Sequence, residues 1–290
     1  MGLVATLSAL RPGDPVDGVY ACTRKDRLVA RTGTPYLALE LRDRTGAVPA
    51  RAFRDADVLA GRFDRGDLVR VRGRAERFRD ALQVDIQAIE RASGADPATF
   101  LPVAFRDVDE LDGFLEHLAG EVHERSYRAL LERLIGDAAL RAEWRRAPCT
   151  RGGHHAYLGG LLEHTVAVGT LALEVAQLHV RLNPDLLLCA ALVHDLGKTR
   201  EFTYGAEIGV SEEGRLLGHL ALGQRILDEA AAAVGMPDDR RLALLHCVLC
   251  HHGPSAAPAG RLASPEALAL YRLNALDATV KGALEHGLPA

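Results

Sequence analysis

The first third of the chain alternates apolar and polar side chains with a period of two. Between Asp17 and Glu90, short alternating runs are separated by turn-forming residues, which predicts β-strands. The clearest runs cover residues 36–41, 48–53, 68–72 and 82–86, and residues 56–63 form a short helical stretch between the third and fourth strands. Three strands, a short helix and two strands in about 75 residues predict an OB-fold β-barrel.

Beyond this region the apolar residues recur at three- and four-residue spacing, which is typical of helices packed on a core. The expected helices cover residues 108–122, 125–135, 137–146, 157–182, 185–196, 216–234, 238–252 and 265–286. Turn formers around Gly94 and Pro97 indicate a linker. We therefore expect a multidomain α and β protein: an OB-fold nucleic-acid-binding domain at residues 1–92, a linker at 93–105 and an all-α domain at 106–290, with no further strand after the linker.

The composition agrees with two domains, and the two parts of the chain differ in net charge. With 290 residues and 48% hydrophobic side chains, the chain is large enough for two cores. Its net charge of −4 conceals an asymmetry, since residues 1–96 hold 17 Lys and Arg against 14 Asp and Glu, whereas the remainder is acidic. This contrast indicates a basic module joined to an acidic one.

The sequence also favours one compartment. It shows neither a secretory type of N-terminus nor an apolar run of the roughly 20 residues that a membrane span requires. Five cysteines, an odd number in a long chain, argue against a disulfide framework. We expect a soluble, cytoplasmic protein with no membrane partner.

Candidate chemistry is concentrated in the helical part, where most of the twelve histidines lie between His154 and His252. They fall at predicted helix ends or in pairs, and an aspartate joins them on the last helix. The candidates are His164, His194-Asp195, His219, His251-His252 and Asp277. Imidazoles and carboxylates from several helices can form one polar cavity, which is how helical proteins build metal sites.

Such a cavity suits phosphoester hydrolysis. Neutral imidazoles supply nitrogen ligands, and a carboxylate such as Asp195 can bridge two cations. Water on such a metal has a pKa near neutrality, and paired metals stabilise the oxygens of an in-line phosphoryl displacement. The spacing of these residues alone supports metal-assisted phosphoester hydrolysis.

Several of these motifs resemble those of a known family. The H…HD…D pattern of His164, His194-Asp195 and Asp277 is similar to that of the HD-domain metal-dependent phosphohydrolases. The resemblance sharpens to the YhaM-type 3′→5′ exoribonucleases, which join an N-terminal OB-fold to an HD domain. The matching strings are HHAYLGGLLEHT (154–165), HDLGK (194–198), GHL (218–220), HCVLCHHG (246–253), LDA (276–278) and, in the barrel, GTPYLALELRDRTGAVPAR (33–51).

The resemblance implies a two-ion centre. One metal would be held by His164, His194, Asp195 and Asp277, and a second by Asp195, His219, His251 and His252. The catalytic residues would be His194, Asp195 and Lys198. Mixed nitrogen and oxygen ligands admit iron, cobalt, nickel or zinc, and the resemblance favours manganese.

Further residues are candidates for substrate binding. In the helical domain these are His154, His155, His246 and Lys198. The plainer interpretation of His154 and His155 is that they are solvated imidazoles, and that of His246 is a histidine that supports a metal ligand. For Lys198 it is a cation favourably placed at a helix C-terminus. In the barrel, Tyr36 and Phe53 are placed to stack on bases, and Arg51 and Arg72 to follow the backbone. The plainer interpretation there is that aromatic side chains fill the barrel and arginines solvate it.

The resemblance implies that the protein is a metal-dependent 3′→5′ exonuclease. By the resemblance, it would act on single-stranded RNA, with DNA as an open second substrate, and release nucleoside 5′-monophosphates. One alternative is an HD-domain phosphohydrolase of free or cyclic nucleotides. Another is a non-catalytic nucleic-acid-binding protein whose metal is structural, although seven candidate ligands exceed the four of a closed structural site.

Overall fold

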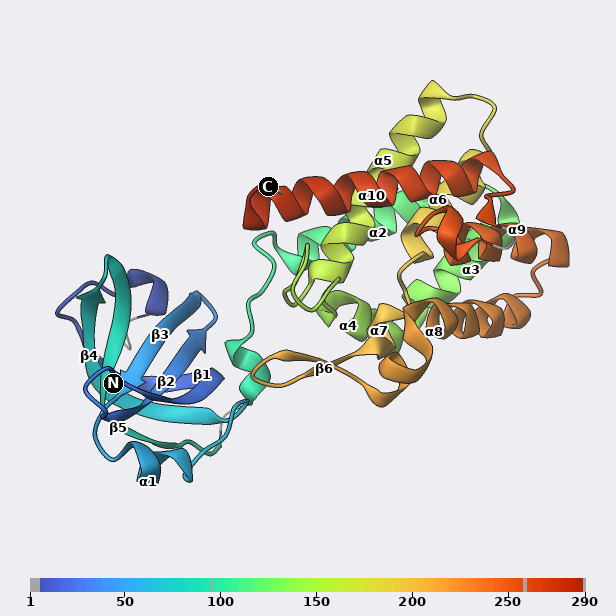
Figure 1. Ribbon diagram of the computed structural model, residues 1–290. Coiled ribbons are helices and arrows are strands. Elements are labelled where there is room, and N and C mark those ends of the chain that lie inside the picture. The colour runs from blue at the N-terminus through green and yellow to red at the C-terminus, as the bar shows by residue number, and fades with distance from the viewer. Residues whose placement is uncertain (1–5, 95, 258–259, 289–290) are drawn as a thin grey trace. The chain divides into compact units, whose positions relative to one another are not determined.

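The computed structural model describes residues 6–94, 96–257 and 260–288, so residue 95 of the predicted linker lies outside it (Figure 1). Packing divides the chain into two compact units. One comprises Met1–Pro102 with Tyr204–Gly209, and the other comprises Val103–Thr203 with Val210–Ala290. The predicted limits of the domains and the linker stay a prediction, but the order of a β unit followed by a helical unit is as expected.

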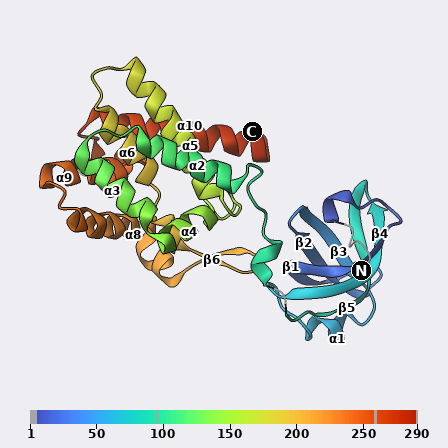
Figure 2. The same cartoon turned by 180° about the vertical axis from the view of Figure 1, so that it is seen from behind.

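The N-terminal unit is a closed five-stranded barrel, which confirms the predicted OB-fold (Figures 1 and 2). Its strands are β1 (Pro15–Val29), β2 (Pro35–Asp43), β3 (Gly46–Ala52), β4 (Leu68–Phe78) and β5 (Ala81–Arg91), with α1 (Ala56–Ala60) before β4. The strand order is β1-β2-β3-β5-β4, and β1 closes the barrel by pairing with β4. The contact between β3 and β5 is parallel, and the other pairings are antiparallel.

The two-residue alternation of the sequence defines the inside of this barrel. Leu37, Leu39 and Leu41 are all buried, because successive side chains of a strand point to opposite faces. Val69 and Val71 are likewise buried inside the barrel from β4. The outward positions of both strands are the ones that remain available to a ligand.

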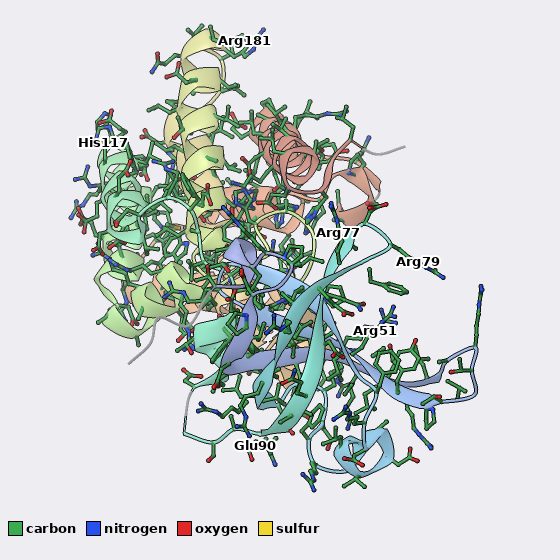
Figure 3. The ribbon with its side chains drawn as sticks, turned by 90° about the vertical axis from the view of Figure 1, so that its left-hand side faces the viewer. Arg51, Arg77, Arg79, Glu90, His117 and Arg181 are labelled. Carbon is green, nitrogen blue, oxygen red and sulfur yellow. The ribbon has the colours of Figure 1, made fainter. Side chains whose placement is uncertain are left out.

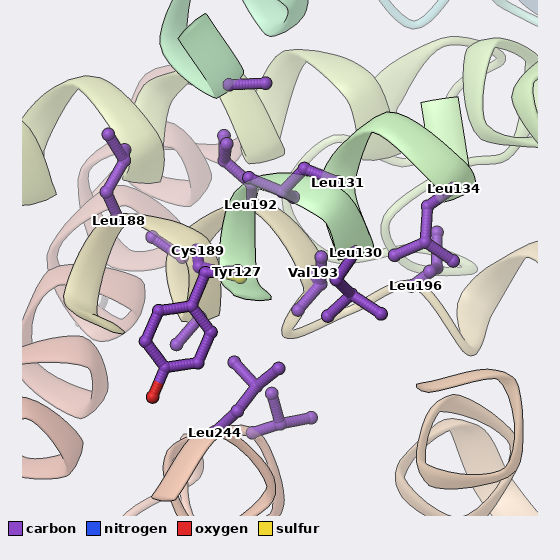
Figure 4. Close-up of a cluster of buried hydrophobic side chains, with 14 of the residues drawn as sticks. Tyr127, Leu130, Leu131, Leu134, Leu188, Cys189, Leu192, Val193, Leu196 and Leu244 are labelled. Atoms are coloured by element: carbon purple, nitrogen blue, oxygen red, sulfur yellow. The ribbon is translucent and has the colours of Figure 1, made fainter. Parts of the chain in front are cut away.

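The second unit is a helical bundle built around α6 (Pro184–Val193), every residue of which from Leu186 onward is buried. Figure 4 shows leucines of α3 packed against it, beside Tyr127. The surrounding helices are α2 (Val108–Gly120), α3 (Arg125–Gly136), α4 (Ala138–Arg146), α5 (Gly160–Leu178), α7 (Lys198–Glu201), α8 (Glu212–Ala233), α9 (Asp238–Leu249) and α10 (Pro265–His286). Side-chain caps fix several starts; Asn183, for example, accepts from the backbone N–H of Leu186 at the start of α6.

The expectation that everything beyond the linker is helical is wrong at one place. A two-stranded hairpin, β6 (Phe202–Tyr204) and β7 (Ile208–Val210), follows α7. Strands of three residues are too short to show a period of two, so their alternation is not visible in the sequence.

Some helix ends also differ from the sequence prediction, and glycine accounts for one of these differences and for a break inside another helix. Gly159 has a φ of 83°, so α5 begins at Gly160 rather than at residue 157. Gly218 has a φ of 69° and breaks α8 just before His219. Glycine adopts this backbone conformation without the steric cost that a side chain adds. Another difference lies in α9, which ends at Leu249, so His251 and His252 follow the helix instead of closing it.

Candidate metal centre

The structure brings the predicted histidines together around Asp195. Oδ2 of Asp195 lies 3.3 Å from Nε2 of His194 and 3.6 Å from Nε2 of His164. Its other oxygen, Oδ1, lies 3.4 Å from Nε2 of His251 and 3.6 Å from Nε2 of His219. His252 completes the second group, with its Nε2 3.0 Å from Nε2 of His219. Two histidine clusters therefore face opposite oxygens of one buried carboxylate.

The backbone after α6 places this carboxylate. Asp195 lies in a tight turn, since its carbonyl accepts from the backbone N–H of Lys198 at 2.9 Å. Gly197 then packs directly on α8: a Cβ at this position would lie 2.0 Å from the carbonyl oxygen of His219 and 2.5 Å from the nitrogen of Gly223. Only glycine permits this approach, which holds His219 beside Asp195.

Hydrogen bonds to backbone carbonyls fix the tautomer of two histidines. Nδ1 of His194 donates to the carbonyl of Ala191 at 2.8 Å, and Nδ1 of His251 donates to that of Val248 at 2.6 Å. Because a carbonyl only accepts, each neutral ring carries its proton on Nδ1 and presents a lone pair on Nε2. Burial lowers the pKa of His251 to about 3, so this ring is neutral near neutral pH.

Lys198 is buried beside the same carboxylate. Its Nζ donates to Oδ2 of Asp195 at 2.7 Å and to the sulfur of Cys149 at 3.4 Å. Burial alone would lower the pKa of this amine, but the adjacent Asp195 carboxylate outweighs burial and raises it. In the same way burial opposes ionisation of Asp195, yet Lys198 keeps the pKa of Asp195 well below its ordinary value. Both groups are therefore charged.

Asp277 approaches the centre from α10 through two histidines. Its Oδ2 accepts from Nδ1 of His164 at 2.6 Å and from Nε2 of His155 at 3.0 Å. Nδ1 of His155 in turn lies 3.0 Å from the hydroxyl of Tyr157, which donates to Glu163 at 2.7 Å. Asp277 thus contacts the side of His164 that faces away from Asp195, and its predicted ligand role stays a prediction.

Of the remaining predicted residues of the helical unit, His154 lies at the centre and His246 does not contact it among the described interactions. His154 lies at the centre, with its ring centroid 5.5 Å from that of His164 and its Nε2 3.5 Å from the sulfur of Cys149. His246 instead accepts from the backbone N–H of Ala263 at 2.9 Å, and none of the described interactions joins it to either cluster. Its predicted contact with substrate stays a prediction.

Sequence reasoning missed three residues at the centre. Cys149 contacts Lys198, Glu201 lies 3.3 Å from Nδ1 of His219, and Oδ1 of Asn274 lies 3.0 Å from Nε2 of His164. Of these three, only Asn274 could have been recognised from the sequence, because it precedes Asp277 by three positions and so lies on the same face of the helix.

Two buried polar atoms without partners indicate that these residues suit a bound cation. Oδ1 of Asp195 and Nε2 of His251 are buried, and among the described residues neither has a hydrogen-bond partner. A buried polar atom without a partner is costly, and a cation between two lone pairs removes that cost. The ligand atoms of His164, His194 and Asp195 lie within 4.8 Å of one another, as do those of His219, His251 and His252.

The barrel carries a separate candidate surface. Tyr36 and Phe53 stack with their ring centroids 5.1 Å apart, and the guanidinium of Arg51 lies 4.4 Å from the ring centre of Phe78. Phe53 and Phe78 are 42% and 38% exposed, which contradicts the plainer interpretation that they fill the barrel. Arg51 and Arg79 lie on one flank of the barrel (Figure 3), where Arg79 is 5.3 Å from the Phe78 ring centre.

Arg72 lies apart from this aromatic group. It is exposed on β4, opposite Asp17 of β1 and Ala88 of β5. Six residues separate it from Phe78 along the strand, which is about 20 Å at the rise of a β-strand. The predicted set of Tyr36, Phe53 and Arg51 is brought together, none of the described ring contacts joins Arg72 to it, and the predicted role of Arg72 stays a prediction.

Comparisons with known proteins agree with both units. Residues 161–279 match the HD domain, and residues 21–92 match an OB-fold nucleic acid binding domain. The 3′-5′ exoribonuclease YhaM of Shouchella clausii is 26% identical over 283 residues, covering 93% of this chain and 85% of the relative. Those of Bacillus velezensis and Bacillus subtilis are 27% and 26% identical over 244 residues, covering 83% of this chain and 77% of each relative.

No helix among the described residues is both long and apolar enough to span a membrane. The matched ranges contain the two structural features described above, since residues 161–279 include both histidine clusters and residues 21–92 include the aromatic group of the barrel. The chain is similar to the YhaM 3′-5′ exoribonucleases over most of its length, and it has an N-terminal OB-fold followed by a helical HD domain.

Proposed function

We propose that this protein is a metal-dependent 3′→5′ exonuclease of single-stranded nucleic acid. The observation that carries the proposal is the convergence of two histidine clusters on opposite oxygens of Asp195. The exoribonuclease relatives, which resemble this chain over most of its length, support RNA as the substrate. Nucleoside 5′-monophosphates are the expected products.

The two clusters would hold two divalent ions. His164, His194 and Asp195 belong to the first site, and Asp195, His219, His251 and His252 to the second. Bound divalent cations supply Lewis acidity and an activated water for phosphodiester hydrolysis. The donors are mostly imidazole nitrogen, which suits first-row transition metals, and manganese is the ion we favour.

The residues around the clusters hold the ligands in their working form. The carbonyls of Ala191 and Val248 hold the proton of each neutral ring on Nδ1, which turns Nε2 of His194 and His251 toward the site, and such outer partners set ligand orientation. Lys198 keeps Asp195 ionised although the carboxylate is buried. This gives Lys198 a positioning role toward Asp195, and its predicted contact with a phosphate requires that it leave this pair.

The barrel would capture the strand. Base stacking on Tyr36, Phe53 and Phe78 tolerates any sequence, and Arg51 and Arg79 add positive charge beside the same rings. The five cysteines are free and buried, which supports a reducing, cytoplasmic location.

Products resolved by length test the proposal. With Mn²⁺, a 5′-labelled linear RNA should shorten progressively, and a covalently closed circle of the same sequence should survive. A chelator should stop degradation, and added Mn²⁺ should restore it. Cleavage of circles as fast as linear strands would indicate an endonuclease, and hydrolysis restricted to free or cyclic nucleotides would indicate the alternative phosphohydrolase.

A further inference from the structure

His164 has a fixed tautomer that determines what its second nitrogen does. Nδ1 lies 2.6 Å from Oδ2 of Asp277, and the same carboxylate oxygen lies 3.0 Å from Nε2 of His155. An ionised carboxylate only accepts, so Nδ1 of His164 carries the proton. Nε2 of the neutral ring then carries a lone pair.

That lone pair faces other lone pairs. Nε2 of His164 lies 3.2 Å from Nε2 of His194, whose proton is also on Nδ1, and 3.0 Å from Oδ1 of Asn274. The amide of Asn274 is oriented by its own donor, since its Nδ2 donates to the carbonyl of His251 at 3.4 Å. The amide oxygen is therefore the atom that faces the imidazoles.

Two acceptors at 3.0 Å require a positive group between them. A second proton on His164 is one solution, but one N–H points at a single acceptor and leaves Nε2 of His194, 3.2 Å away, facing the same nitrogen without a donor. A divalent cation is the other, and Oδ2 of Asp195, 3.6 Å from the same nitrogen, belongs to the same group of atoms. Asn274 is also nearly buried, at 9% exposure, which leaves its oxygen little access to solvent.

We propose that Asn274 supplies the fourth protein ligand of the first metal site, through its amide oxygen, and that Asp277 is a positioning residue that orients His164. This rests on the proposed two-ion centre. Each residue then has one function: Asn274 completes the set formed by His164, His194 and Asp195, and Asp277 holds the ring from behind. Asp195 becomes the one carboxylate that this ligand set contains.

Metal binding in the absence of RNA tests the assignment. Mn²⁺ affinity and stoichiometry are measured by calorimetry on the metal-free full-length chain carrying Asn274→Asp, Asn274→Ala or Asp277→Asn. Asn183→Asp is the matched control, because it makes the same amide-to-acid change at the start of α6, where Asp is an equally good cap. Circular dichroism establishes that each variant is folded.

We expect Asn274→Asp to tighten Mn²⁺ binding at the first site by about tenfold or more, since a carboxylate replaces a neutral oxygen donor. Asn274→Ala should abolish the binding of one ion or weaken that binding more than Asp277→Asn does, because loss of an outer partner of a ligand typically changes affinity by about 10- to 100-fold and loss of a ligand by more. Asn183→Asp should leave binding unchanged.

Two results would overturn the assignment. Unchanged or weaker Mn²⁺ binding by Asn274→Asp would mean that the amide only accepts a proton from His164, and a larger loss from Asp277→Asn than from Asn274→Ala would make Asp277 the ligand. Because no substrate is present, a protein that responds as expected but degrades no RNA refutes the proposed function and leaves the ligand assignment standing.

Discussion

Oδ1 of Asp195 and Nε2 of His251 lie 3.4 Å apart in the interior of the helical unit, and neither has a hydrogen-bond partner in the part of the chain that the structure describes. Within the described ranges, no carbonyl, hydroxyl or amide compensates for the removal of these two atoms from water. A folded protein retains such a pair where an ion fills the space, so the pair is the most direct place to test the centre.

Replacing His251 by alanine should reduce RNA degradation by more than about 100-fold, because outer partners of metal ligands already cost about 10- to 100-fold and a ligand costs more. The content of bound metal should fall in parallel. His117→Ala, which removes an exposed imidazole from α2, is the matched control and should retain full activity. Full turnover by His251→Ala after chelation and reloading would show that the second cluster holds no catalytic ion.

The buried pair of Asp195 and Lys198 makes a prediction about stability. Asp195→Asn leaves the Lys198 ammonium buried without its counter-charge, which should lower the free energy of unfolding by about 3 to 5 kcal/mol. Adding Lys198→Met should recover most of that loss, since no unpaired charge remains, while activity stays absent. Denaturant unfolding of metal-free protein measures both effects, and a double variant no more stable than Asp195→Asn alone contradicts the pairing.

The close contact of Gly197 with α8 predicts that this position tolerates no side chain. The added Cβ of Gly197→Ala would overlap the carbonyl of His219, so α8 must shift, at a cost of about 1 to 3 kcal/mol and with a loss of activity. Gly113→Ala is the control, because a Cβ there meets no atom within 4 Å and alanine favours the interior of α2. Equal melting temperatures for the two variants would argue against the close contact.

In the barrel, Phe53→Ala should weaken binding of a long single-stranded RNA by about 1 to 3 kcal/mol, the usual contribution of one stacked base. Val58→Ala, on α1 and 57% exposed, removes apolar surface elsewhere in the barrel unit and should have no effect. Fluorescence anisotropy in a His251→Ala background separates binding from degradation. Cleavage of very short oligonucleotides by otherwise unaltered enzyme should change little, and an equal loss on both substrates would assign the barrel a structural role only.

Much of this architecture was predictable because it depends on periodic burial. The buried series Leu37, Leu39 and Leu41 indicated a barrel strand, and the spacing of apolar residues indicated the helices. The hairpin around Gly205 was not predictable, since three-residue strands carry no measurable period. Its position after α7 also explains why one predicted helix boundary was misplaced, as Ser211 caps α8 at Glu212.

The candidate site was predictable in composition but not in detail. Residue types and order indicated that His164, His194 and Asp195 would meet, yet they gave no information on which nitrogen of a ring carries its proton. That depends on partners far apart in sequence, such as Asp277 on His164. The distinction between a ligand and the group behind it, here between Asn274 and Asp277, is a matter of a few ångströms within one helical turn.

The placement of one planar carboxylate between two histidine clusters has a thermodynamic consequence. Both oxygens of Asp195 turn together, so an ion that fixes Oδ2 at the first cluster also restricts Oδ1 at the second. The conformational entropy of the side chain is then lost once rather than twice, which favours positive cooperativity between the ions. Mn²⁺ uptake should follow a sigmoidal isotherm, and His251→Ala should lower the affinity of the intact first cluster as well.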